Sequence, residues 1–308
     1  MNYPKFSILM CTYNGSEFLT EQLDSIYNQN SQDWVLYVSD DGSTDETINI
    51  LNSYKSIWGE KLTIFNGPQS GFCQNYLSLC ARVSPQTDYF VWSDQDDIWL
   101  PNKLSRALEL MDPLGQTTPV LYCAQTILVD RHNQQYGLSP QLYSHLTGFR
   151  NSLIQCSGGA NTMVFNRSAL NLIRTGYQSK LPSHDWWAYQ IVSGAGGQVI
   201  YDNTPTLRYR QHGKNLVGTF TGLKPKIQRV RYIFGKNYKI DIDQNINALV
   251  LNESLLTEDN KKILHDYIRV HNSKNPLTRV KYLKRSKIYR QNFVEQMSLY
   301  LFAFFNLL

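Results

Sequence analysis

Short apolar runs alternate with helical patterns of apolar residues through the first half of the chain. Leu19, Leu23 and Ile26 recur at i, i+4 and i+7, as on one buried face of a helix. Four apolar runs have the length and composition of strands: 6–11, 34–39, 62–65 and 89–93. Strands that alternate with helices are typical of a mainly parallel sheet covered on both faces, so we predict an α/β fold.

Two further helices have recognisable starts. Asp45 precedes a segment with Ile48 and Leu51, and we predict that it caps a helix there. Pro101 is expected to open a helix whose apolar face is formed by Leu104, Leu108 and Met111.

The second half is less regular. Strands are predicted at 120–124, 162–165 and 199–201, with a polar loop near 130–140. Beyond about His212 the sequence becomes basic and helical. We therefore expect a nucleotide-binding and catalytic domain over 1–215 and a mostly helical region over 216–308.

Polar and acidic residues follow three of the predicted strands, at 12–14, 40–41 and 94–97. In an open parallel sheet, ligands bind beyond the carboxyl ends of the strands. A site with this much negative charge and no basic neighbour in sequence favours a divalent cation such as Mn²⁺ or Mg²⁺ bridging to a phosphate. Taken singly, each cluster is also compatible with a turn or a helix start.

Four motifs together resemble glycosyltransferase family 2, whose members share the GT-A fold. They lie at 7–14 (SILMCTYN), 38–45 (VSDDGSTD), 90–101 (FVWSDQDDIWLP) and 184–187 (HDWW). The resemblance covers about residues 5 to 215 and implies an enzyme that transfers a sugar from a nucleotide-sugar donor to an acceptor hydroxyl. The donor-binding residues it implies are Thr12, Tyr13, Asn14, Asp40, Asp41 and Asp94.

The resemblance also implies the metal ligands and the catalytic base. Asp96 would be the principal metal ligand with help from Asp94, and Asp97 would cap the following helix. Asp185 matches the catalytic base of the family, whereas His184 departs from the Glu usually found beside it. From the sequence alone, Asp185 is also compatible with an ordinary helix N-cap.

The segment Tyr209-Arg-Gln-His212 follows the proposed base. By analogy with related enzymes, Arg210 or His212 would close over the pyrophosphate, and His212 would join the metal site. Trp186 and Trp187 would form an aromatic platform for the acceptor, although core packing explains at least one of them equally well.

The residues of these motifs are similar to those of bacterial rhamnosyltransferases that build surface polysaccharides. This similarity implies dTDP-L-rhamnose as donor and a glycan or lipid-linked glycan as acceptor, with a UDP-sugar as the main alternative. A non-catalytic nucleotide-sugar-binding protein is a further alternative. A nicotinamide-dependent oxidoreductase is disfavoured, because residues 12–16 (TYNGS) replace the Gly-x-Gly-x-x-Gly turn after the first strand.

Charge is distributed unevenly in this chain, whose net charge is +5. No acidic residue occurs between Asp266 and Glu295, and the apolar stretch 297–308 that follows is too short to span a bilayer. This combination is compatible with a membrane-surface anchor or with a helix packed on the protein's own core. We expect a cytoplasmic protein, peripheral on the membrane at most, with reduced cysteines and no nucleic-acid partner.

Overall fold

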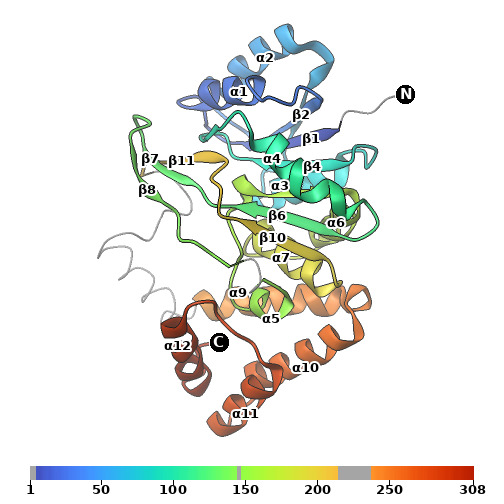
Figure 1. Cartoon of the computed structure of the whole chain (residues 1–308), viewed down its shortest axis with the longest axis vertical. Coiled ribbons are helices and arrows are strands. Elements are labelled where there is room, and N and C mark those ends of the chain that lie inside the picture. Colours follow the sequence, from blue (N-terminus) through green and yellow to red (C-terminus); the bar gives the residue numbers. More distant parts are fainter. Residues whose placement is uncertain (1–4, 144–146, 214–236) are drawn as a thin grey trace.

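The computed structural model describes residues 5–143, 147–213 and 237–308. Its larger sheet has seven strands in the order β10-β6-β9-β4-β1-β2-β3 (Figure 1). Only β9 runs antiparallel to its neighbours in this sheet. The seven strands are β1 (Phe6–Thr12), β2 (Trp34–Asp40), β3 (Leu62–Asn66), β4 (Tyr89–Ser93), β6 (Val120–Ala124), β9 (Val164–Asn166) and β10 (Gln198–Asp202).

Helices cover both faces of this sheet, as the sequence predicts. Ile8 and Met10 of β1 belong to the apolar cluster beneath α1 and α4, whereas Leu9 between them belongs to the cluster beneath α3, α6 and α7. Successive side chains of a strand point to opposite faces, so a strand buried on both sides becomes apolar throughout. The covering helices are α1 (Leu19–Tyr27), α2 (Thr47–Trp58), α3 (Phe72–Arg82), α4 (Lys103–Met111), α5 (Phe149–Ser152), α6 (Arg167–Ile173) and α7 (His184–Gly194).

Helix starts differ slightly from the prediction. The N-cap of α2 is Glu46, one residue after Asp45, and it makes no capping bond with its side chain. Asp45 still helps the first turn, because Oδ1 accepts a hydrogen bond of 3.1 Å from the backbone of Thr47. After Pro101, α4 begins two residues later than expected, at Lys103.

A smaller sheet contains elements that the sequence patterns did not indicate. Its strands are β5 (Ile98–Trp99), β11 (Leu207–Gln211), β7 (Ile127–Asp130) and β8 (Gln135–Leu138), in that order. The polar loop predicted near 130–140 is therefore wrong in part, because β7 and β8 form an antiparallel hairpin there. The residues of β8 are largely exposed, so no apolar run marks this edge strand.

The C-terminal region is helical, as predicted, over its described residues. It contains α9 (Asn237–Leu251), α10 (Glu258–Asn272), α11 (Pro276–Ser286) and α12 (Phe293–Phe304), at the end of the molecule opposite α1 and α2 (Figure 1). Apolar residues such as Ile242 and Leu264 lie in the same buried cluster as Trp187 of α7. The boundary that we place near residue 215 falls within 214–236, which lie outside the described residues, so it stays a prediction.

Two further features bear on location and redox state. Among the described residues, none of the helices has the length and apolar character needed to cross a bilayer. None of the five cysteines, which all lie within the described residues, forms a disulfide, and three of them are buried. That they are reduced stays a prediction.

Candidate active site

The polar residues that follow β1, β2 and β4 meet at one edge of the larger sheet. Thr12 at the end of β1 lies in register with Asp40 at the end of β2, and Met10 lies in register with Ser93 at the end of β4. These strands are adjacent and parallel, so their carboxyl ends form a single rim. The three clusters predicted from the sequence therefore lie together.

Asp40 is turned into the protein. Its carboxylate accepts hydrogen bonds from the Thr12 hydroxyl (2.8 Å) and from the backbone and hydroxyl of Ser43 (2.8 and 2.5 Å). A buried carboxylate needs such donors to offset its lost hydration. These bonds fix the turn after β2.

Asp41 reaches in a different direction, toward the segment after β3. Its two carboxylate oxygens accept hydrogen bonds from the backbone N–H groups of Gln69 (2.6 Å) and Gly71 (3.0 Å). Asp41 therefore shapes the loop that leads into α3.

The segment after β1 is tied to the acidic loop after β4. The side chain of Gln95 accepts a hydrogen bond from the backbone N–H of Tyr13 (2.9 Å) and donates one to its carbonyl (3.1 Å). Asn14 adopts a left-handed backbone conformation (φ 48°), and its side-chain oxygen accepts from the backbone of Thr44 (2.8 Å). The ring of Tyr13 itself is 58% exposed, so it is available to a ligand.

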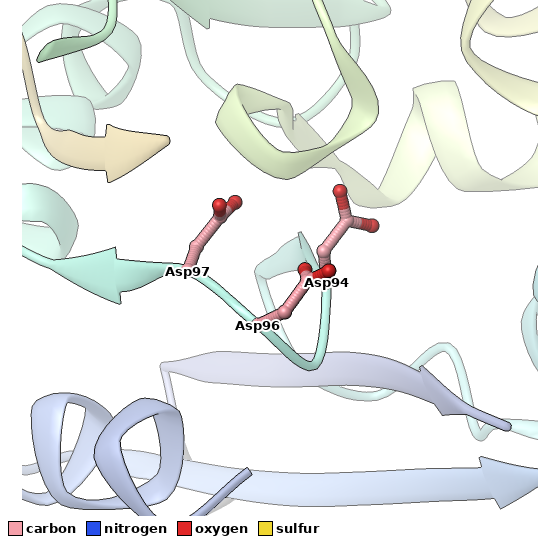
Figure 2. A group of neighbouring side chains, drawn as sticks. All are labelled: Asp94, Asp96 and Asp97. Atoms are coloured by element: carbon pink, nitrogen blue, oxygen red, sulfur yellow. The ribbon is translucent and has the colours of Figure 1, made fainter. Parts of the chain in front are cut away.

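Asp94, Asp96 and Asp97 form a cluster of carboxylates in the loop between β4 and β5. The three side chains project from this loop toward the same side (Figure 2), and ligand atoms from each lie within 4.8 Å of one another. Desolvation and the neighbouring charge of Asp96 raise the pKa of Asp94 to about 7, and the charge of Asp185 adds to this rise. A divalent cation is the usual way to relieve repulsion of this kind.

The three carboxylates differ in their burial and in the hydrogen bonds that they accept. Asp97 is fully buried and accepts hydrogen bonds from the Asn161 side chain (2.6 Å) and the Arg210 backbone (3.1 Å). Asp94 is half-buried and accepts one from the Tyr76 hydroxyl (2.9 Å). The predicted helix-capping role of Asp97 is wrong, because α4 begins six residues later and Asp97 faces the interior.

His212 lies against the third carboxylate of the cluster. Its Nε2 is 2.8 Å from Oδ2 of Asp96, although β11 and the acidic loop are far apart in the sequence. An imidazole nitrogen and carboxylate oxygens form a donor set that Mn²⁺ accepts well. Asp96 therefore belongs to the carboxylate cluster with Asp94 and Asp97 and also contacts His212, and ligands of these kinds suit a divalent cation.

Arg210 does not face an open site, so its predicted contact with the pyrophosphate is a misassignment. Its side chain is 1% exposed and donates hydrogen bonds to the carbonyls of Asp96 (3.0 Å) and Arg131 (2.8 Å). It also pairs with Glu21 of α1 at 2.7 Å, while Phe18 lies under the guanidinium. Arg210 thus holds the acidic loop in place from behind.

Asp185 lies in the first turn of α7, but it is not the N-cap. The N-cap is Ser183, whose hydroxyl oxygen accepts a hydrogen bond from the backbone of Trp186. The same hydroxyl donates to Oδ1 of Asp185, so the carboxylate is oriented by the cap. The N-cap position is therefore held by Ser183 and not by Asp185, although Oδ1 of Asp185 also accepts a hydrogen bond of 2.7 Å from the backbone N–H of Trp186.

The comparisons with known proteins agree with this geometry. The family model described as Glycosyl transferase family 2 matches residues 7–172, which is more than half of the chain. The chain belongs to this family. Within it, a dTDP-rhamnosyl transferase, RfbG of Shigella flexneri, is 28% identical over 258 residues, which cover 78% of this chain and 84% of that protein.

Solved glycosyltransferase structures have the same fold. A complex of residues 1–349 of S. aureus TarS with UDP-GlcNAc superposes with a TM-score of 0.55 at 14% identity, covering 92% of this chain and 93% of the TarS 1–349 chain. The mannosyltransferase PcManGT of Pyrobaculum calidifontis, in complex with GDP-Man and Mn²⁺, superposes with a TM-score of 0.51 at 15% identity, covering 100% and 88% of the two chains. The α/β GT-A fold expected from the motifs is thereby confirmed.

The two tryptophans that follow Asp185 have different positions in this family 2 enzyme. Trp187 is fully buried and donates to the Ile173 carbonyl (3.0 Å), so its predicted contact with the acceptor is wrong. Trp186 is partly buried, donates to the Ser152 carbonyl (2.6 Å) and stacks on Tyr238 of α9. Adjacent helix positions are rotated by about 100°, which separates the two rings.

His184 occupies the position before Asp185 as an uncharged aromatic residue. Its ring stacks on Tyr76 with centroids 4.1 Å apart and meets the edge of Trp92 at 4.7 Å. Burial lowers its pKa to about 4, although the nearby Asp185 opposes this shift. His184 therefore packs beneath the site as a neutral ring, in contact with the tyrosine that holds Asp94.

Sequence reasoning missed several residues that shape this glycosyltransferase site. Lys103 is buried, donates to the Asn161 carbonyl (2.6 Å) and lies over the ring of Trp99, and its pKa is lowered to about 7 by burial. Tyr76 and Gln95 hold the acidic loop as described above. A lysine next to Asn102 at a helix start gives no sign of burial in sequence, because lysine is rarely buried without a partner.

Proposed function

We propose that this glycosyltransferase is an inverting, metal-dependent enzyme that moves L-rhamnose from dTDP-L-rhamnose to an acceptor hydroxyl during bacterial surface polysaccharide synthesis. The observation that best supports the chemistry is the cluster of Asp94, Asp96 and Asp97 after β4, with His212 against Asp96 and with Asp185 close enough for its charge to raise the pKa of Asp94.

The carboxylates and the histidine are the metal ligands in this proposal. Asp96, Asp94 and His212 would hold Mn²⁺ or Mg²⁺, which supplies positive charge where the nucleoside diphosphate departs. Arg210 and Gln95 would keep the loop in its binding geometry, since Arg210 donates to the Asp96 carbonyl and the Gln95 side chain links the loop to the backbone of Tyr13. Positioning of this kind lowers the cost of organising the site during reaction.

Asp185 is the proposed general base. It would take the proton of the acceptor hydroxyl as the acceptor oxygen bonds to the anomeric carbon and the bond from that carbon to the phosphate oxygen breaks. The electron pair of the broken bond leaves with the nucleoside diphosphate, and the single displacement inverts the anomeric centre. The hydrogen bond from Ser183 would orient the carboxylate for this step.

The nucleoside is proposed to lie on the rim formed by Thr12, Tyr13, Asn14 and Asp41, with Asp40 supporting the turn. Tyr13 is the aromatic residue of this group, and its exposed ring suits stacking on a base. We also propose that residues 1–215 form the catalytic domain and that 216–308 form a helical region beside it.

The rhamnose assignment is supported by the relative from Shigella flexneri, whose name gives dTDP-rhamnose as its donor. The TarS complex supports the alternative of a UDP-linked N-acetylhexosamine or hexose. A third alternative is a non-catalytic nucleotide-sugar-binding protein. The acceptor would be a glycan or a lipid-linked glycan, and a cytoplasmic location supplies the nucleotide sugars.

A donor screen tests the proposal. Purified protein with Mn²⁺ is incubated with dTDP-L-rhamnose, UDP-glucose, UDP-galactose and UDP-N-acetylglucosamine, and both melting temperature and donor hydrolysis are recorded. We expect dTDP-L-rhamnose to give the largest thermal shift, since the tightest ligand stabilises most at equal concentration. A larger shift with a UDP-sugar would replace rhamnose with that donor, and binding without any turnover would favour the non-catalytic alternative.

A further inference from the structure

The last helix of the chain, α12, is apolar on two opposite faces. Leu299 and Ala303 point into the core shared with the other C-terminal helices and are fully buried. Such burial is what a helix packed on its own protein requires. Packing on the protein's own core, one of the two alternatives that the sequence left open, therefore explains one face of this helix.

The opposite face of α12 is apolar and exposed. Phe293 is 78% exposed and Leu301 is 58% exposed, and they lie within about 80° of each other around the helix axis. Five large apolar side chains of α12 are exposed on this side, and Phe305 directly after the helix is exposed as well: Phe293, Val294, Met297, Leu301, Phe304 and Phe305. Single exposed apolar residues are ordinary, but a contiguous group of this size marks an interaction surface.

This face is held firmly in place. The buried guanidinium of Arg279 on α11 donates hydrogen bonds to the carbonyls of Ala303 and Phe304 at the end of α12. Asn292 caps the start of the helix, accepting a hydrogen bond from the backbone of Val294 (2.9 Å). Both ends of α12 are thus anchored, which keeps the six side chains together on the surface.

Positive charge lies on the helix beside α12. Lys281 and Lys284 are exposed on α11, which packs directly against α12. Packed helices lie about 10 Å apart, so these cations act on anything that covers α12.

The acidic residues that flank this segment do not cancel its charge. Asp266 is paired with Arg285 at 3.0 Å, and Glu295 is paired with Arg290 at 3.3 Å. Between these two acids the chain has no other carboxylate side chain. A surface with apolar residues at its centre and unbalanced cations beside it is complementary to an anionic lipid bilayer.

We propose that the outer face of α12 inserts into the headgroup region of an anionic membrane, with Lys281 and Lys284 of α11 binding the lipid phosphates. α12 is about 18 Å long and lies along the bilayer plane in this arrangement, as interfacial helices do. The contact places the enzyme on the membrane without a spanning segment. This proposal depends only on the C-terminal helices, so it is independent of which nucleotide sugar is the donor.

Vesicle sedimentation of the full chain tests this proposal. We expect the protein to bind vesicles containing phosphatidylglycerol and to bind pure phosphatidylcholine much more weakly. Phe293→Gln/Leu301→Gln should lower the partition coefficient at least about tenfold, because it removes two apolar side chains from the contact. Lys281→Gln/Lys284→Gln should lower it by a similar factor at low salt and make the remaining binding less sensitive to salt.

Ile57→Gln is the matched control, since Ile57 is 77% exposed and belongs to α2, a helix at the opposite end of the molecule from α12 (Figure 1). It should leave vesicle binding unchanged, and every variant should keep the wild-type melting temperature and donor-induced thermal shift. Absence of binding by the wild type, or equal binding by Phe293→Gln/Leu301→Gln, overturns the proposal. A concentration-dependent dimer that this double variant abolishes also overturns it, because a second copy then covers α12.

Discussion

His212 Nε2 lies 2.8 Å from Asp96 Oδ2, which joins the end of β11 to the acidic loop that follows β4. Two residues earlier, Arg210 donates a hydrogen bond to the main-chain carbonyl of the same aspartate. β11 reaches this position by pairing with β5 and β7 in the smaller sheet. The smaller sheet therefore fixes both the backbone and the carboxylate of Asp96.

Asp96→Asn tests the metal site at this junction. The amide keeps the size of the side chain and an oxygen atom, but it loses the negative charge that a divalent cation requires. We expect Mn²⁺ binding in the presence of a nucleoside diphosphate to weaken at least about tenfold and turnover to fall at least about a hundredfold. Isothermal titration with Mn²⁺ and a steady-state assay measure the two effects.

Asp259→Asn is the control for Asp96→Asn, because Asp259 is exposed on α10 and pairs only with Lys262 among the described ion pairs. It should bind Mn²⁺ and turn over like the wild type. If folded Asp96→Asn retained normal metal affinity, the cation site would have to be sought at other residues.

Arg210→Met tests the structural role assigned to the buried guanidinium. The substitution leaves the carbonyls of Asp96 and Arg131 without their donor and removes the partner of Glu21. Removing one partner of a buried ion pair destabilises a protein, but here Glu21 is half-exposed. We therefore expect a loss near the lower end of the range for buried pairs, about 2 kcal/mol of the free energy of unfolding. Urea denaturation measures it.

Arg131→Met removes an exposed ion pair with Glu17 and should cost less than about 1 kcal/mol. Equal losses for Arg210→Met and Arg131→Met would contradict the assigned role of Arg210. A stable Arg210→Met protein with weaker donor binding would instead restore the predicted contact with the pyrophosphate.

The parallel strands could be predicted because burial on both faces makes them apolar throughout. Phe6–Thr12 is one example, and the polar residues at the strand ends follow from the same reasoning. β11 was missed because Arg208 and Arg210 interrupt its apolar pattern. The local sequence does not show that Arg210 is buried, because the main-chain carbonyls that it contacts belong to distant segments.

The positions of Trp186 and Trp187 illustrate a second limit. Both follow the proposed base and both are aromatic, so composition assigns them the same role. Only the packing of α7 against α6 and α9 decides that Trp187 enters the core while Trp186 stays at its edge. Likewise, Ser183 rather than Asp185 caps α7 because the chain enters the helix two residues earlier than the motif suggests.

His184 predicts a pH dependence of stability. Its folded pKa of about 4 lies below the usual 6.5, so below pH 6.5 the unfolded chain takes up a proton that the buried ring refuses. The stabilisation is complete above about pH 6.5 and is lost as the pH falls toward 4. At about pH 4.5 we expect about 2 to 3 kcal/mol less stability than at about pH 7 from this group alone.

His184→Phe keeps an aromatic ring against Tyr76 and Trp92 and cannot be protonated. Its free energy of unfolding, measured in urea at both pH values, should therefore fall by about 2 to 3 kcal/mol less than that of the wild type. His132→Phe changes an exposed histidine and should follow the wild type. An identical pH dependence in His184→Phe and wild type would show that His184 titrates normally in the folded protein.

The final prediction separates the proposed base from the cap that orients it. Ser183→Ala removes the capping hydroxyl of α7 and should cost about 1 kcal/mol of stability, with less than about a tenfold loss of turnover. Asp185→Asn leaves that cap in place but cannot accept a proton, so turnover should fall at least about a hundredfold while the melting temperature changes little. Donor affinity, measured directly by titration, should be unchanged in both. If Asp185→Asn kept more than about a tenth of the wild-type turnover, a base contributing about 10²- to 10⁴-fold would have to be another residue. If Ser183→Ala instead caused the larger loss of turnover, the contribution of this helix end would lie in the position of α7 and not in proton transfer by Asp185.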